Sequence, residues 1–116
     1  MTVLLIAGAG AAGVLARYGI GQVTPSIWAT LFVNVIGSLL LGVLVQAGRE
    51  LSPELRDVLG VGLLGGFTTF STFSVQAVLD TEAGEPGRAM AYVLASVVLG
   101  IAAAGFGYWI GHVVRH

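Results

Sequence analysis

The stretch GGFTTFSTF, residues 65–73, decides how this chain folds. It places two glycines, four hydroxyl side chains and three phenylalanines between the apolar runs LGVGLL and SVQAVL. Glycine costs about 1 kcal/mol relative to alanine inside a helix, and Thr and Ser hydroxyls compete for backbone hydrogen bonds. We therefore predict a helix that breaks at mid-membrane. The alternative is a continuous helix in which Gly62 and Gly66 form a small-residue packing site.

The composition indicates an integral membrane protein. Of the 116 residues, 56% are hydrophobic and only 9% are charged, whereas soluble domains carry about 25% charged residues. The chain has no cysteine, which excludes disulfides and thiolate metal sites. Its net charge of −1 argues against a nucleic-acid partner. The length suits one membrane domain, residues 1–116.

Four apolar stretches are each near the roughly 20 residues that span a bilayer. They cover about residues 3–21, 27–47, 55–79 and 89–114. Ser52 and Pro53 are expected to cap and open the third helix. We expect an all-α membrane protein of four transmembrane helices.

The arginines are nearly balanced between the two ends of these helices. Arg49, Arg56 and Arg115 fall on the side of the termini, whereas Arg88 and Arg17 fall on or near the other side. The positive-inside rule, which predicts orientation from an excess of Lys and Arg on one side, therefore favours neither orientation strongly. Either the chain inserts with a slight preference for one orientation, or two oppositely inserted copies pair as an antiparallel dimer.

Polar side chains recur at helical spacing inside the spans. Thr30, Asn34 and Ser38 share one face of the second segment, and Tyr92 and Ser96 share a face of the fourth. They either hydrogen-bond between helices or line a pathway. Arg17 either snorkels to the interface or attracts anions at a pathway mouth.

The broken segment itself offers groups for ions of both signs. Phe70 and Phe73 are spaced i, i+3 beside hydroxyls, and the positive edge of an aromatic ring can face an anion. Backbone carbonyls freed by a break can hold a hard cation.

Together, GGFTTFSTF, the upstream TLFVNVIGSLLLG (residues 30–42) and GAGAAGVLARYG (residues 8–19) resemble the small bacterial fluoride channels known as Fluc or CrcB. The resemblance covers essentially the whole chain. It implies a passive fluoride-selective channel of the bacterial cytoplasmic membrane that exports fluoride and relieves its toxicity. It also implies a dual-topology homodimer with two antiparallel pores, and membrane lipid as surroundings.

The resemblance assigns roles to individual residues. It implies a vestibule arginine at Arg17 and a structural sodium ion at the dimer axis, held by the backbone carbonyls of Gly65 and Thr68. The implied anion pore comprises Asn34, Phe70, Phe73, Thr30, Ser71, Thr72, Tyr92 and Ser96. The chain departs from the family pattern at Gln76, where members often carry glutamate, and at Gly100, where they often carry serine.

Other functions stay open at this point. A proton-coupled exporter of the small multidrug type also has four spans, but it needs a buried carboxylate that the first segment lacks. A non-transporting module, packed through residues such as Gly107 and Gly111, leaves Asn34 and the hydroxyls unexplained. The chain could also be a non-conducting partner in a heterodimeric fluoride channel. An enzyme is not expected, because no His, Cys or acid lies deep in a span.

Overall fold

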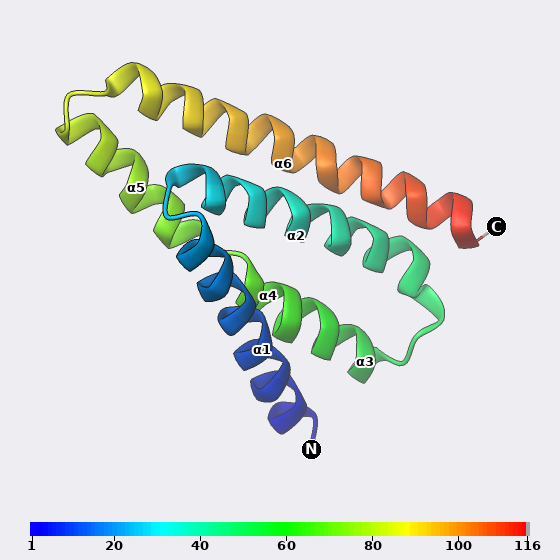
Figure 1. Ribbon diagram of the computed structural model, residues 1–116. Coiled ribbons are helices and arrows are strands. Elements are labelled where there is room, and N and C mark those ends of the chain that lie inside the picture. Colours follow the sequence, from blue (N-terminus) through cyan, green and yellow to red (C-terminus); the bar gives the residue numbers. More distant parts are fainter. Residues whose placement is uncertain (116) are drawn as a thin grey trace.

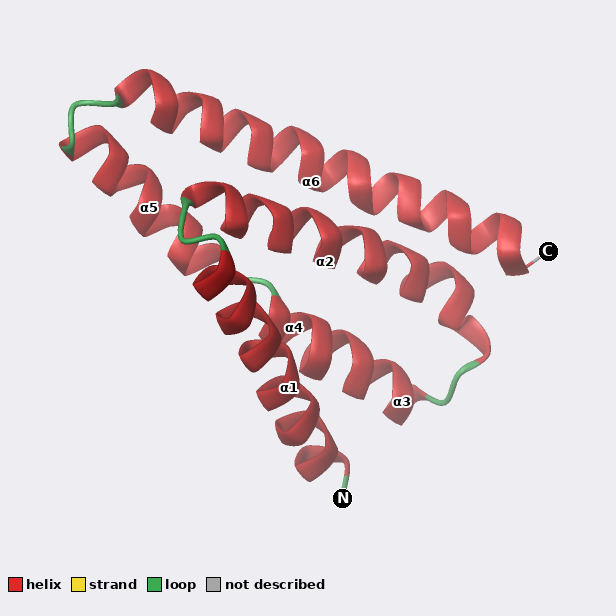
Figure 2. Cartoon of the chain, in the orientation of Figure 1, coloured by secondary structure: helices red, strands yellow, loops and turns green. Residues whose placement is uncertain are grey.

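The computed structural model describes residues 1–115, which form helices joined by short turns (Figure 1). Figure 2 shows loops at the connections, at the interruption of the third segment and at the N-terminal end. In chain order the elements are α1 (Thr2–Val23), α2 (Ile27–Ala47), the 3₁₀ turn η1 (Gly48–Glu50), α3 (Pro53–Asp57), the π-helical η2 (Val58–Leu64), α4 (Gly65–Phe67), α5 (Phe70–Glu82) and α6 (Pro86–Arg115).

Capping residues set where the helices begin. The Ser26 side chain accepts a hydrogen bond from the Trp28 amide, which fixes the start of α2. Ser52 accepts one from the Leu55 amide at 3.1 Å, and Pro53 is the first residue of α3. The predicted start of the third segment is therefore confirmed.

The described residues contain four apolar helical segments of membrane-spanning length, so the chain is a multi-pass membrane protein. The segments are Thr2–Val23, Ile27–Glu50, Pro53–Glu82 and Pro86–Arg115. Large apolar side chains cover much of the outer surface, among them Val23 at 85% exposure and Phe70 at 78%. Lipid or another chain must cover such a surface.

Glycines bring the helices close together in two pairs. In the first pair, α2 lies along α6 (Figure 1). Gly107 faces the Leu39 carbonyl and Gly111 faces the Val43 carbonyl, and at both positions a Cβ would collide with α2. The prediction that Gly107 and Gly111 pack helices is confirmed.

In the second pair, α1 packs against the third segment. Gly62 approaches the Ile6 carbonyl and Gly66 approaches the Gly10 carbonyl, again with no room for a Cβ. Close contact of backbones through small residues is how apolar helices associate in a membrane.

The third segment is interrupted, as predicted, but not at the glycine pair. Gly65 and Gly66 remain helical in α4, and the extended residues are Thr68 (ψ 160°) and Thr69 (φ −154°, ψ 119°). Gly66 serves the contact with α1, whereas the hydroxyl residues lie at the break. The break and the packing site, posed as alternatives, are both present. The interruption falls midway along the segment Pro53–Glu82.

Candidate functional site

The Asn34 side chain forms two hydrogen bonds with the backbone at the interruption. Its Nδ2 donates to the Thr69 carbonyl at 2.9 Å, and its Oδ1 accepts from the Thr69 amide at 2.8 Å. The side-chain amide therefore pairs with one residue of backbone as a neighbouring β-strand would. Buried backbone groups freed from a helix need such partners in a membrane.

The break takes helical donors away from several carbonyls, among them those of Gly65 and Thr68. The Thr69 amide, which would donate to Gly65, donates to Asn34 instead. The Thr72 amide, which would donate to Thr68, donates to the Thr69 hydroxyl at 3.2 Å. Gly65 and Thr68 thus lose their usual helical donors, and these are the two carbonyls that the resemblance assigned to sodium.

Arg17 reaches the same interruption from α1. Its Nε donates to the Gly66 carbonyl at 3.2 Å, at the C-terminal end of α4. A guanidinium there satisfies a freed carbonyl and complements the partial negative charge of the helix end. This contact directs the Arg17 side chain to the break.

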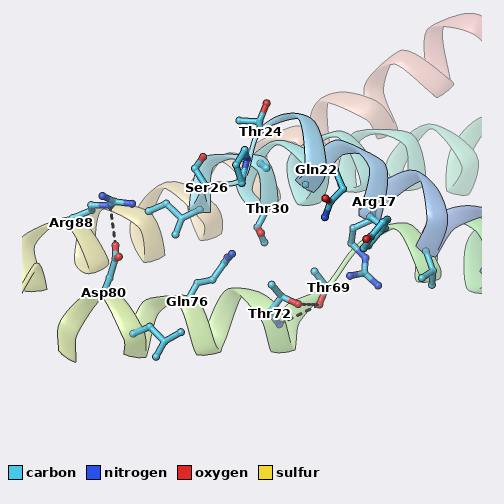
Figure 3. A pocket seen from close by; sticks show the side chains of 17 residues that line it. Arg17, Gln22, Thr24, Ser26, Thr30, Thr69, Thr72, Gln76, Asp80 and Arg88 are labelled. Atoms are coloured by element: carbon cyan, nitrogen blue, oxygen red, sulfur yellow. Dashed lines mark hydrogen bonds and ion pairs between the residues drawn. The ribbon is translucent and has the colours of Figure 1, made fainter. Parts of the chain in front are cut away.

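A cavity of about 550 Å³ lies between α1, α2, α5 and α6 and includes Arg17, Thr30 and Thr72 in its wall. Figure 3 shows their side chains around this space, with the amide nitrogen of Gln76 directed into it. Thr72 comes from the first turn of α5, because Thr69 caps that helix. Three of the predicted pathway residues therefore meet here.

A second cavity, of about 280 Å³, lies on the other side of the break. Asn34, Ser38, Gly65, Thr68 and Phe70 are among its lining residues. Thr69 lines both cavities. The interrupted backbone therefore lies between two cavities, one lined by Arg17 and Thr30 and the other by Asn34.

Phe70 and Phe73 lie side by side but in different surroundings. Their ring centroids are 5.7 Å apart and the rings are tilted by 52°. Phe73 packs edge-on against Tyr92, with centroids 5.1 Å apart. The Phe70 ring projects from the chain at 78% exposure. Within one chain the two rings do not enclose a site.

The remaining predicted residues are placed as follows. The buried Tyr92 hydroxyl donates to Gln76 Oε1 at 2.8 Å, so its proton is directed to that side chain. The Ser96 hydroxyl is buried and has no hydrogen-bond partner among the described residues, although neither of the two cavities includes it. Ser71 is exposed, with its hydroxyl 3.5 Å from that of Thr69.

The predicted site residues did not include Thr69, which lies at the break and lines both cavities. Its backbone pairs with Asn34, and its hydroxyl caps α5 and donates to the Thr72 hydroxyl at 3.1 Å. A Thr before the first residue of a restarting helix is a typical N-cap. That signal was available once a break had been predicted. Asp80 and Arg88, which line the larger cavity, were also missed because they belong to turns in the sequence.

Side-chain chemistry offers no metal site of the usual kind. Among residues 1–115, no group of three or more His, Cys, Asp or Glu side chains could hold a metal ion.

Comparison with known proteins agrees with this architecture. The family model described as CrcB-like protein, Camphor Resistance (CrcB), matches residues 4–108. The chain is 43% identical to a Fluoride-specific ion channel FluC of Thermus thermophilus, with 93% of each chain covered. It is 46% identical to the protein of that name from Rhodospirillum centenum (85% of this chain, 86% of the relative). For Agrobacterium fabrum the identity is 42%, with 96% of each covered. This chain belongs to the CrcB family.

Proposed function

We propose that this chain is a passive, fluoride-selective channel that exports fluoride across the bacterial cytoplasmic membrane and so relieves its toxicity. The observation that carries the proposal is the similarity, over nearly the full length, to relatives named fluoride-specific ion channels. The polar interruption of the third segment is the feature of this chain that such a function would use.

The groups around the interruption suit a small anion. Fluoride is tightly hydrated, so a pathway must replace its water with hydrogen-bond donors. Thr30 and Thr72 bring hydroxyls, and Arg17 brings a fixed positive charge beside them. Asn34 uses one N–H on Thr69 and keeps a second one. Neutral donors bind an anion firmly enough to admit it and weakly enough to release it.

No active transport step is needed. Proton-coupled exporters use carboxylates inside the membrane, and the first segment of this chain has none. The gradient of fluoride alone would drive flow, and the family's chemistry is conduction and not catalysis.

We further propose that two copies pair in antiparallel orientation. The exposed Phe70 ring has no partner across its outer face within the chain, and the smaller cavity beside it is open. A second copy would enclose both, so that Phe70 and Phe73 present ring edges to an anion in the shared pathway. The three-to-two distribution of arginines supports insertion in both orientations.

We also propose a structural sodium ion at this interface between copies. The carbonyls of Gly65 and Thr68 have lost their helical donors, and unwound carbonyls are the ligands that sodium takes in transporters with broken helices. Two carbonyls are too few for a hard cation, which takes several oxygen ligands. A second copy would supply the others, so the ion would hold the dimer together at its axis.

The test is anion efflux from liposomes that hold this one purified chain, with fluoride compared against chloride. Rapid fluoride efflux without chloride leak is expected. A folded preparation that passes neither ion contradicts a self-sufficient channel. Flux that returns on co-expression with a homologous chain would then establish the heterodimer, in which this chain alone does not conduct.

A further inference from the structure

An ion pair lies at one end of the larger cavity. Arg88 Nε is 3.1 Å from Asp80 Oδ2, and both residues line the space (Figure 3). Asp80 lies in the last turn of α5 and Arg88 in the first turn of α6. Asp80 follows the start of α5 by about ten residues, so it lies roughly 15 Å along the helix from the break that Arg17 contacts.

The carboxylate depends on this single arginine. The Asp80 side chain is 15% exposed, whereas that of Arg88 is 46% exposed. Asp80 Oδ2 is buried, and no described residue gives it a well-aligned hydrogen bond. Arg88 is therefore its charge partner from α6. The other charged group in the cavity wall is Arg17.

The position of the carboxylate is unusual for an anion pathway. The wall carries two arginines and one aspartate, and the aspartate is the less exposed member of the pair. A bare carboxylate in the wall of this cavity would repel an approaching anion. The ion pair cancels that field.

We propose that Arg88 is a positioning residue for conduction: it neutralises Asp80 so that anions can enter the cavity. This inference rests on the proposed route of fluoride through the cavity. Arg88 need not touch the anion. Its role is to offset the negative charge of Asp80, which would otherwise repel anions from the cavity. If Asp80 is made neutral, conduction should no longer require Arg88.

Fluoride efflux from liposomes tests this with four variants of the full chain. Arg88→Gln is expected to lower the initial rate by on the order of three- to tenfold. Arg88→Lys should keep a rate near that of the unmodified chain. The double variant Asp80→Asn/Arg88→Gln should recover to within about twofold, and Asp80→Asn alone should conduct at least as fast as the unmodified chain. The control is Glu82→Gln, because Glu82 is close in sequence but lines a different cavity.

The double variant separates charge from structure. Both Arg88→Gln and the double variant lose the ion pair, but only the single variant leaves a bare carboxylate. A purely structural role predicts equal loss in both. The deficit of Arg88→Gln should also shrink when an impermeant salt is raised from about 0.1 to 1 M, since the Debye length falls from about 10 to 3 Å.

Several outcomes overturn the inference. Unchanged fluoride flux in Arg88→Gln would contradict the inference. So would a double variant Asp80→Asn/Arg88→Gln that conducts as slowly as Arg88→Gln. If Arg88→Gln does not fold, a loss of flux in Asp80→Asn contradicts it by itself. Thr72→Val reports on the route separately. If Thr72→Val slows efflux while the Arg88 variants do not, the route holds and only the charge-pair role fails.

Discussion

The side-chain amide of Asn34 and the backbone of Thr69 form two hydrogen bonds, 2.9 and 2.8 Å long, across the interruption of the third helix. A residue of α2 thereby completes the backbone pairing of another segment. The contact uses both a donor and the acceptor of the amide, and an ionised aspartate of the same size has no donor to offer. The same contact frees the carbonyl of Gly65.

Asn34→Asp should abolish fluoride efflux and destabilise the chain. The carboxylate has no N–H for the Thr69 carbonyl and adds a negative charge to the anion path. An unsatisfied buried group costs about 1–3 kcal/mol, so thermal unfolding should shift as well as flux. Leu40→Val, on the same helix but exposed and outside both cavities, serves as the control. Normal conduction by Asn34→Asp would mean that α2 does not line the pathway.

Phe70→Ile and Phe73→Ile should each cut fluoride efflux strongly, because isoleucine has no positive ring edge. Their stabilities should differ. Phe73 also packs edge-on against Tyr92, so its loss should cost about 1 kcal/mol more than loss of the exposed Phe70. Phe106→Ile is the control, because Phe106 also belongs to an aromatic pair, in which it stacks on Trp109. Unchanged flux in both test variants would remove the ring-edge role.

Gly66→Ala should destabilise the fold, whereas Gly65→Ala should not. A Cβ on Gly66 would collide with the Gly10 carbonyl of α1, but one on Gly65 meets only the Gly60 carbonyl at 3.5 Å. The expected loss for Gly66→Ala is about 1–3 kcal/mol, and Gly65→Ala should be neutral or gain up to about 1 kcal/mol. Thermal unfolding in detergent checks both. Equal stability of the two variants would contradict the close packing of α1 on the third segment.

If two copies pair around a sodium ion as proposed, removal of sodium should weaken that dimer. An ion that binds only the folded dimer adds about 2.7 kcal/mol at a hundredfold excess over its Kd. Replacing sodium by potassium or a larger organic cation at equal ionic strength should therefore lower Tm and favour monomers in size-exclusion chromatography. Indifference to the identity of the cation would exclude a site formed by the carbonyls of Gly65 and Thr68.

Much of the architecture could be read from the sequence because it follows from local chemistry. The apolar stretches predicted the four membrane-length helices, and Ser52 with Pro53 predicted the start of the third segment. The glycines and hydroxyls of residues 65–73 predicted its interruption. The interruption lies at Thr68 and Thr69, within this stretch, whereas Gly65 and Gly66 stay helical and Gly66 contacts α1.

For the predicted pathway residues, the sequence did not predict which cavity or hydrogen-bond partner each side chain meets. Helical spacing put Thr30 and Asn34 on one face, yet they line different cavities on the two sides of the break. Tyr92 and Ser96 also share a spacing, but the Tyr92 hydroxyl is directed to Gln76 and the Ser96 hydroxyl lies outside both cavities. Periodicity locates a face of a helix and does not say which groups on a facing helix take its hydrogen bonds.

The sequence by itself determined that this is a four-helix membrane protein with a weak point in its third helix, because hydropathy and helix propensity act over short stretches of chain. Only the tertiary structure decided that Asn34 pairs with Thr69 at the break, that Arg17 contacts Gly66, and that Asp80 and Arg88 line one end of the cavity. The first two contacts join residues 35 and 49 positions apart, and the third joins two helices across a turn. Such partners are fixed by how the helices pack against one another, and the glycine contacts of α1 and α6 set that packing.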